Sequence, residues 1–406
     1  MSVFAMRTAR FCGLLLLALC SLVHAAPLSL RFEHLGVEQG LTQESVTRVI
    51  QDRQGFIWIG TQAGLNRFDG YRVTVFKNDP GNPHSLLDNY VQALYEDANG
   101  RLWVGSKGGL DRYDPSTGGF VHQAIKAGNL AVTNIIGDGK DGLWLTTSEG
   151  LQHLDIQSGQ VRTLRHAPAD PDSISDDRVN AVARDKSGNL WIGTASGLEM
   201  LPPGAAKFLH LTPRDGATPS NNITSLSAGP DGLVWAGAMA GLQAWRVDGA
   251  TPKRLPPAVS QPFGDLRVNV LMHDSDGTLW VGTQEDGLKR RDPASGEFHS
   301  YRWDSLNRHG IGDNQITALY QDRTGTLWVG NWYSGLDWVD LDSGGFERYT
   351  ESSGVLPGVS NSKVRAISGA GDNKIWLGSG EGLTRLDVAK RTVESWHRDE
   401  LSLIHI

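Results

Sequence analysis

One phrase of sequence returns eight times in this 406-residue chain and constrains its fold more than any other feature. Each copy has a Gly-x-Leu-Trp-Val-Gly-Thr core, or a close variant, followed within a few residues by Gly-Leu. The tryptophans are Trp58, Trp103, Trp144, Trp191, Trp235, Trp280, Trp328 and Trp376. Their successive spacings are 45, 41, 47, 44, 45, 48 and 48 residues. This period, with one tryptophan per repeat, is typical of an all-β fold, the β-propeller, in which each repeat forms a four-stranded blade.

The first repeat shows how one blade is built. We expect an inner strand over residues 46–51, a second over 56–61, a third over 65–69 and an outer strand over 72–76. Asp52 and Gly55 fit a turn between the first two strands, because aspartate bonds its own backbone and glycine accepts a positive φ. Each tryptophan lies mid-strand between apolar neighbours, and we expect it to pack between blades.

The N-terminal strand indicates how the ring closes. Residues 30–35 have the pattern of an outer strand and precede the first inner strand. Residues 345–349 have the same pattern and precede the inner strand that begins at Val364. An orphan outer strand can complete the last blade and remove its open edge. We therefore predict a seven-bladed propeller over residues 27–345 and the first blade of a second, truncated propeller over 346–400. A single eight-bladed ring also fits the repeat count and remains open.

The two ends of the chain differ from the repeats. Residues 1–26 contain Arg7 and Arg10, an apolar run and small residues at 25–26, the pattern of a secretory signal peptide, although an uncleaved anchor is the alternative. Residues 401–406 resemble a translated sequencing adaptor, so we expect a non-native tail on a fragment of a longer protein. An ordinary C-terminus is the alternative.

Composition limits the compartment and the partners. Both cysteines, Cys12 and Cys20, lie in the predicted signal peptide, so the mature chain can form neither disulfides nor thiolate metal sites. Export without cysteines fits a bacterial periplasm. Loss of Arg7 and Arg10 takes the formal net charge from −7 to −9, which argues against nucleic acid and anionic membrane surfaces as partners.

The repeats resemble a known family. Residues 56–69, Phe-Ile-Trp-Ile-Gly-Thr-x-x-Gly-Leu-Asn-Arg-Phe-Asp, look like the two-component regulator propeller repeat, and residues 100–114 are similar. The resemblance implies a periplasmic sensor region joined, through a membrane helix absent from this chain, to a histidine kinase or diguanylate cyclase. We expect the full-length protein to be a homodimer tethered to the inner membrane. His153, Met200, Ala244 and Trp338 replace the arginine of the family pattern.

A binding role fits the sequence better than catalysis. The 12 histidines form no His-x-x-x-His pair, and no nucleophile elbow or phosphate loop is present. We therefore predict no catalytic residue, no metal and no cofactor. The alternative is a secreted propeller scaffold, or an enzyme such as a carbohydrate-active protein.

Two hairpin loops are one residue longer than the others and belong to neighbouring blades. Their aromatic, acidic and amide side chains suit a small molecule or an oligosaccharide. The predicted ligand-binding residues are Gln284, Glu285, Asp286, Asn331, Trp332 and Tyr333, with Asn89 and Asn314 from loops before inner strands. Packing of Trp332 and Tyr333 on the blade is the alternative.

Overall fold

The computed structural model describes residues 30–125, 130–211, 221–248, 251–256, 263–341, 363–369, 371, 374–387 and 392–397. The chain divides into two compact units, residues 1–342 and 343–406. The predicted signal peptide and the predicted C-terminal tail lie outside the described residues. Within those residues, the strands form eight four-stranded sheets, seven in the first unit and one in the second.

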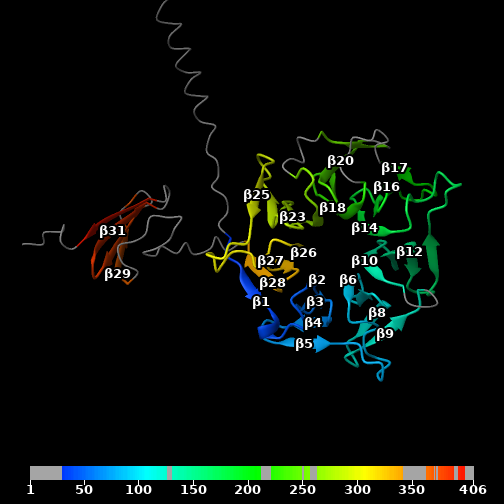
Figure 1. Ribbon diagram of the computed structural model, residues 1–406, viewed down its shortest axis with the longest axis horizontal. Helices are drawn as coiled ribbons and strands as arrows, with labels where there is room; N and C mark the ends of the chain where they lie inside the picture. Colours follow the sequence, from blue (N-terminus) through cyan, green and yellow to red (C-terminus); the bar gives the residue numbers. More distant parts are fainter. Residues whose placement is uncertain are drawn as a thin grey trace, which may run out of the picture. The chain divides into compact units, whose positions relative to one another are not determined.

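The seven sheets of the first unit are the blades of a propeller (Figure 1). Blade 1 contains β2 (Val46–Gln51), β3 (Ile57–Thr61), β4 (Gly64–Phe68) and β5 (Val73–Phe76). Blade 2 contains β6 (Val91–Glu96), β7 (Leu102–Ser106), β8 (Gly109–Asp114) and β9 (Gly119–Gln123). Blade 3 contains β10 (Val132–Gly137), β11 (Gly142–Thr147), β12 (Gly150–Asp155) and β13 (Val161–Leu164). Blade 4 contains β14 (Val179–Arg184), β15 (Leu190–Thr194), β16 (Leu198–Leu201) and β17 (Leu209–His210).

The remaining blades repeat this order. Blade 5 contains β18 (Ile223–Ala228), β19 (Leu233–Ala238), β20 (Leu242–Asp248) and β21 (Thr251–Arg254). Blade 6 contains β22 (Val268–His273), β23 (Leu279–Thr283), β24 (Leu288–Arg291) and β25 (Phe298–Tyr301). Blade 7 contains β26 (Ile316–Gln321), β27 (Thr326–Asn331), β28 (Leu336–Asp340) and the N-terminal β1 (Glu33–Leu35), which a short 3-10 helix, η1 (Val37–Gln39), follows.

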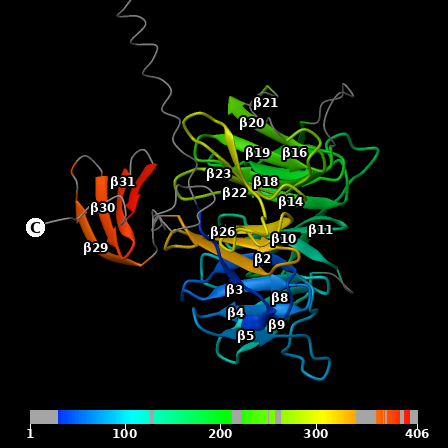
Figure 2. The ribbon, with the colours of Figure 1, turned by 60° about the vertical axis from the view of Figure 1, so that its left-hand side comes forward.

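The N-terminal strand closes the ring, as the sequence predicts. β1 pairs antiparallel with β28, with His34 opposite Asp337 and Leu35 opposite Leu336. Blade 7 then packs on blade 1, where the Thr317 hydroxyl donates to the carbonyl oxygen of Val46 at 2.5 Å. Figure 2 shows β26 beside β2 at this junction. The first unit is therefore a closed seven-bladed ring, and the eight-bladed alternative does not describe it.

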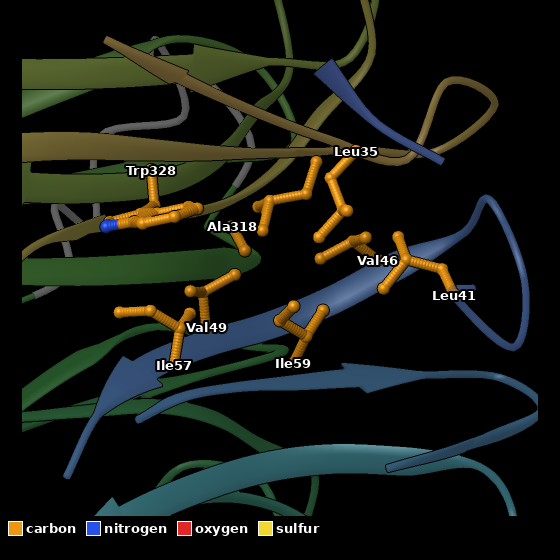
Figure 3. Packing of buried hydrophobic residues seen from close by; sticks show 9 residues of the cluster. Leu35, Leu41, Val46, Val49, Ile57, Ile59, Ala318 and Trp328 are labelled. Atoms are coloured by element: carbon orange, nitrogen blue, oxygen red, sulfur yellow. The ribbon is translucent and has the colours of Figure 1, made fainter. Parts of the chain in front are cut away.

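Apolar side chains from both blades fill this closing junction (Figure 3). The buried cluster comprises Leu35, Leu41, Val46, Val49, Ile57, Ile59, Ala318, Trp328 and Leu336. Leu35 comes from β1, so the N-terminal strand contributes to the seam between blades as well as to its own sheet. Burial of this apolar surface favours the closed ring.

In five of the blades, the indole N–H of the repeat tryptophan donates a hydrogen bond to the turn aspartate six residues earlier. In blade 1, Asp52 Oδ1 accepts from the backbone N–H groups of Gln54 and Phe56, and Asp52 Oδ2 accepts from the Trp58 indole at 2.7 Å. The other pairs are Asp97–Trp103, Asp185–Trp191, Asp274–Trp280 and Asp322–Trp328. The aspartate therefore fixes both the turn and the orientation of the tryptophan.

In four blades of the ring, the side chain opposite the tryptophan on the third strand lies against its ring. Arg67 lies over Trp58 and Arg290 over Trp280. In blade 3, the ring of His153 lies 4.6 Å from that of Trp144, and its Nε2 donates to Asp138 Oδ2 at 2.9 Å. In blade 7, the ring of Trp338 lies 5.6 Å from that of Trp328. Different side chains therefore cover the tryptophan at this position.

The second unit contains one described sheet, β29 (Val364–Gly369), β30 (Lys374–Ser379), β31 (Gly382–Asp387) and β32 (Thr392–His397). All six residues of β29 are exposed, whereas each inner strand of the ring begins with a buried valine or isoleucine. A blade needs neighbours to cover its faces. That this sheet begins a second propeller stays a prediction.

The ion pair between His34 and Asp337 predicts that the stability contributed by β1 depends on pH. His34 Nδ1 lies 2.6 Å from Asp337 Oδ1, and this hydrogen bond raises the pKa of His34 above its usual 6.5. The stabilisation is fully present below about pH 6.5 and is lost as the pH rises through the raised pKa. We expect the difference in Tm between the wild type and His34→Asn to shrink as the pH rises from 6 to 9. An unchanged difference would mean that the pair contributes no pH-dependent stability.

Candidate functional site

Seven polar side chains surround the propeller axis, one from the second position of each inner strand. This polar ring consists of Thr47, Gln92, Thr133, Asn180, Thr224, Asn269 and Thr317. All seven line one cavity with a volume of about 540 Å³, which we call the axial cavity. Most of these inner strands are labelled around the centre of the ring in Figure 1. A cavity of this size lies within the range of small-molecule sites, about 300–1,000 Å³.

A β-bulge at the start of each inner strand positions the polar ring. In blade 1, Val46 pairs with Thr61 and Arg48 pairs with Gly60, so Thr47 has no partner on β3. The same shift in register occurs in the other six blades. A bulge adds one residue and redirects its side chain. The first residue, such as Val46, therefore stays in the core while the second faces the axial cavity.

Most of the polar ring also joins neighbouring blades, because a side chain from one blade donates to a carbonyl oxygen at the first residue of the next inner strand. These bonds are Thr47 to Val91 (2.6 Å), Asn180 to Ile223 (2.8 Å), Thr224 to Val268 (2.5 Å), Asn269 to Ile316 (3.0 Å) and Thr317 to Val46 (2.5 Å). Thr133 instead bonds Thr146 within its own blade at 2.8 Å. Gln92 Oε1 is buried and has no partner within the described ranges, so it can accept a bond from a ligand.

The other residues that line the axial cavity come from two sets of loops and from one strand. Tyr90, Asn222, Arg267 and Gln315 each precede an inner strand, Met239, Gln284 and Trp332 each follow a second strand, and Arg48 lies on β2. A smaller cavity of about 170 Å³ shares Arg48, Asn180, Thr224 and Asn269 with the axial cavity. Among the described residues that line the axial cavity there is no aspartate, glutamate, histidine or cysteine. The arrangement suits hydrogen bonding better than acid–base chemistry.

Arg48 breaks the symmetry of the ring. It occupies the third position of an inner strand, where the other blades have Ala93, Asn134, Ala181, Ser225, Val270 and Ala318. Its Nη1 donates to the carbonyl oxygen of Thr47 at 2.7 Å, and its Nη2 donates to that of Thr133 at 3.1 Å. Arg48 thus extends from blade 1 to blade 3. Burial lowers the pKa of its guanidinium, which remains charged at neutral pH.

The structure brings two of the residues predicted from the sequence to the axial cavity. Gln284 and Trp332 line it from blades 6 and 7. Each is anchored through its backbone N–H, which donates to the carbonyl oxygen of Arg267 and of Gln315 respectively. The Trp332 carbonyl oxygen also accepts from the Ser45 hydroxyl at 2.8 Å, so blade 1 helps to hold this loop.

The other predicted residues of the two long loops do not line the axial cavity. Glu285 is exposed, and Tyr333 is 70% exposed. Asp286 forms ion pairs with Lys289, at 2.6 Å, and with Arg302. Asn331 is fully buried, and neither its Nδ2 nor its Oδ1 has a partner within the described ranges. Whether any of these residues binds a ligand stays a prediction.

Asn89 and Asn314 hold loops at equivalent places in two blades. Asn89 Oδ1 accepts from the backbone N–H of Asn78 at 2.7 Å, and Asn314 Oδ1 accepts from that of Trp303 at 2.9 Å. Neither residue lines the axial cavity. Their amide oxygens are committed to the loop that leads from an outer strand to the next inner strand.

Sequence reasoning missed the polar ring and Arg48. The signal was available, because one threonine, asparagine or glutamine follows the first valine or isoleucine of every inner strand in the ring. We predicted only an inner strand over residues 46–51, with no role for its second and third residues.

The described residues contain neither a candidate metal site nor a candidate membrane-spanning helix. No group of three or more histidine, cysteine, aspartate or glutamate side chains there could hold a metal ion. The helices of the same residues include none long and apolar enough to cross a membrane.

Comparisons with known proteins agree with the fold. A model of the two component regulator propeller matches residues 40–63, 85–108, 173–196, 262–285 and 310–333. The extracellular domain assigned to a hybrid two component system of B. thetaiotaomicron is similar in structure, with a TM-score of 0.72 and 22% identity over 91% of this chain and 49% of that one. Virginiamycin B lyase from Staphylococcus aureus shares the fold with a TM-score of 0.59 and 12% identity, over 77% of this chain and 99% of that one.

One curated protein also matches, over a short segment. It is histidine kinase P4 from Formosa agariphila, which is 43% identical over 47 residues, or 12% of this chain and 3% of that protein. This chain therefore spans about half of the solved extracellular domain and a small part of the curated kinase. In the five matched segments, the repeats of this chain are similar to the two-component regulator propeller repeat.

Proposed function

We propose that this chain is the ligand-sensing propeller of an exported signal-transduction protein, and that its ligand binds in the axial cavity. The observation that carries the proposal is the cavity, to which every blade contributes one polar side chain. Binding sites combine concave shape with a few convergent polar groups. Trp332 adds an aromatic surface at the same place, so the cavity suits a small molecule or an oligosaccharide.

We further propose a periplasmic location, a tether to the inner membrane, a homodimeric full-length protein and a histidine kinase or diguanylate cyclase output. The predicted signal peptide and the similarity to an extracellular domain support export. The similarity to a histidine kinase supports a kinase output.

The genomic locus tests the signalling part of the proposal directly. We expect the reading frame to continue beyond codon 400 into further propeller repeats, a membrane helix and an output domain. An output assay of the complete protein, with and without a ligand of the propeller, then measures the coupling. A stop codon shortly after codon 400, with no membrane helix downstream, would favour a secreted scaffold or enzyme.

Trp332 provides a prediction for the ligand-binding part. Its half-buried side chain lines the axial cavity, and a buried aromatic anchor contributes about 1–3 kcal/mol to binding. We expect Trp332→Ala to weaken binding about tenfold or more, since 1.4 kcal/mol is a factor of ten. The measurement is calorimetry with a ligand found by a thermal-shift screen of oligosaccharides and small metabolites.

Tyr71→Ala is the control, because Tyr71 is an aromatic residue that is 95% exposed and does not line the axial cavity. Its affinity for the ligand should equal that of the wild type. Equal affinities of both variants would mean that the ligand binds elsewhere.

A further inference from the structure

The axial cavity carries positive charge without a compensating carboxylate. Arg48 and Arg267 line it, and no acidic residue among those described does so. The chain as a whole has a net charge of −7, so the charge of this cavity is opposite in sign to that of the chain. A cation in a concave site of low dielectric pays a desolvation penalty that only an opposite charge or good hydrogen bonds offset.

Arg48 keeps hydrogen-bonding capacity available for a ligand. A guanidinium has five N–H donors, and Arg48 makes hydrogen bonds to the carbonyl oxygens of Thr47 and Thr133. Within the described ranges, Arg48 forms no ion pair with a carboxylate, and its guanidinium makes only these two hydrogen bonds. The two bonds orient the guanidinium, and the small side chains at the equivalent positions of other blades leave space beside it.

Arg267 differs from its counterpart in blade 4. Arg178 and Arg267 each directly precede an inner strand, and each has an aspartate two residues earlier. Arg178 pairs with Asp176 at 3.1 Å and does not line the axial cavity. Arg267 is exposed at the cavity and forms no ion pair with any described residue. The same position therefore holds a neutralised arginine in one blade and an available one in the other.

We propose that the axial cavity binds an anion that carries hydroxyl groups, of the class of carboxylate-bearing sugars, with Arg48 as its anchor. This inference rests on the proposed function and specifies the ligand class of the same site. Arginine binds a carboxylate through paired N–H···O bonds that are stronger than neutral ones. The threonine, asparagine and glutamine side chains of the polar ring can donate to and accept from hydroxyl groups. Trp332 supplies an apolar face for the sugar ring.

A matched pair of probes tests the charge requirement. Digalacturonate carries two carboxylates, and its dimethyl ester keeps both sugar rings without the charges. Isothermal titration of the purified chain should show binding of digalacturonate at least about tenfold tighter than of the ester, because a hydrogen bond to a charged group contributes more than a neutral one. Acetate should bind at least tenfold more weakly than digalacturonate, because it lacks the hydroxyl groups.

Three arginine variants assign the effect to the site. Arg48→Gln and Arg267→Gln should each weaken the binding of digalacturonate, Arg48→Gln by about tenfold or more, and should leave the affinity for the ester unchanged. Arg178→Gln should bind digalacturonate like the wild type. Circular dichroism and Tm show whether each variant is folded, and Arg267→Gln tests the charge at an exposed position if Arg48→Gln fails to fold.

The possible results separate this inference from the proposed function. The anion site is overturned if the acid and its ester bind with equal affinity. It is also overturned if Arg48→Gln and Arg267→Gln both bind digalacturonate as tightly as the wild type. Failure of digalacturonate to bind at millimolar concentration also overturns it. In each case the ligand-sensing function is still tested separately, by the output assay and by the affinity of Trp332→Ala for a ligand from the screen.

Discussion

A chain that begins at Gly36, and so lacks β1, is expected to lose most of its folding free energy. Phe32 and Leu35 are 1% and 4% exposed, and burial of side chains of this size contributes about 1.5–3 kcal/mol each. Their removal also exposes the edge of β28 and leaves the buried carboxylate of Asp337 without His34. The two side chains together contribute about 3–6 kcal/mol, before the lost strand pairing is counted, which is comparable with the whole stability of many proteins, about 5–15 kcal/mol. Urea unfolding followed by tryptophan fluorescence measures it.

Two controls make this result specific to the closing strand. Glu33→Ala changes an exposed side chain on β1 and should shift the free energy of unfolding by less than about 0.5 kcal/mol. A synthetic peptide of residues 27–36, added to the truncated chain, should restore stability by adding the missing strand to β28. If the truncated chain unfolds at the same urea concentration as the wild type, β1 does not close the ring.

Trp58→Ala is expected to destabilise the propeller by about 3–5 kcal/mol, the usual cost of deleting a buried aromatic side chain. Trp58 is 1% exposed, and its ring lies 5.5 Å from that of Phe76 in its own blade and 4.9 Å from that of Tyr113 in blade 2. The substitution therefore leaves a cavity between two blades. The free energy of unfolding in urea measures the cost, and Trp303→Ala, at a 53% exposed position, should cost far less.

Asp52 should depend on Trp58 for part of its effect. Asp52→Ala removes an acceptor for two backbone N–H groups and for the indole, and should cost about 1–3 kcal/mol. Because the two residues share one hydrogen bond, the double variant should cost less than the sum of the single ones. Strict additivity would contradict the coupling. Ligand affinity should stay unchanged in Asp52→Ala, because this turn lies outside the axial cavity.

The repeated parts of the fold could be predicted from the sequence because their physical causes are local. The inner strand of blade 1 begins and ends as expected, and the aspartate and glycine of its first turn act as the turn chemistry requires, with Gly55 at a φ of 97°. The closing strand was predictable because an outer-strand pattern stood where no blade preceded it. The indole bond to Asp52 needed the three-dimensional arrangement, since six residues of sequence do not show that a turn and a strand face each other.

The site was harder to predict, because side-chain type does not show where a polar atom points. Asn89 and Asn314 have side-chain amides that could bind a ligand, yet their Oδ1 atoms accept hydrogen bonds from backbone N–H groups of their own loops. Thr47 lies within the predicted inner strand, and only the bulge in register turns it towards the axis. Gln284 and Trp332 of the two long loops line the axial cavity, whereas Arg48, which also lines it, stands in a strand of blade 1.

The pairing of β1 with β28 has a consequence for the order in which the ring folds. Synthesis begins at the N-terminus, so β1 emerges first, while its partner residues lie 303 positions later in the chain, as the His34–Asp337 pair shows. Contacts between distant residues form late, because the chain between them must first be ordered. Each blade packs on the one before it, and β28 becomes available to pair with β1 only when blade 7 forms. We therefore expect ring closure to be the last step of folding, and the incomplete ring to expose two strand edges that can pair with other chains until that step is complete.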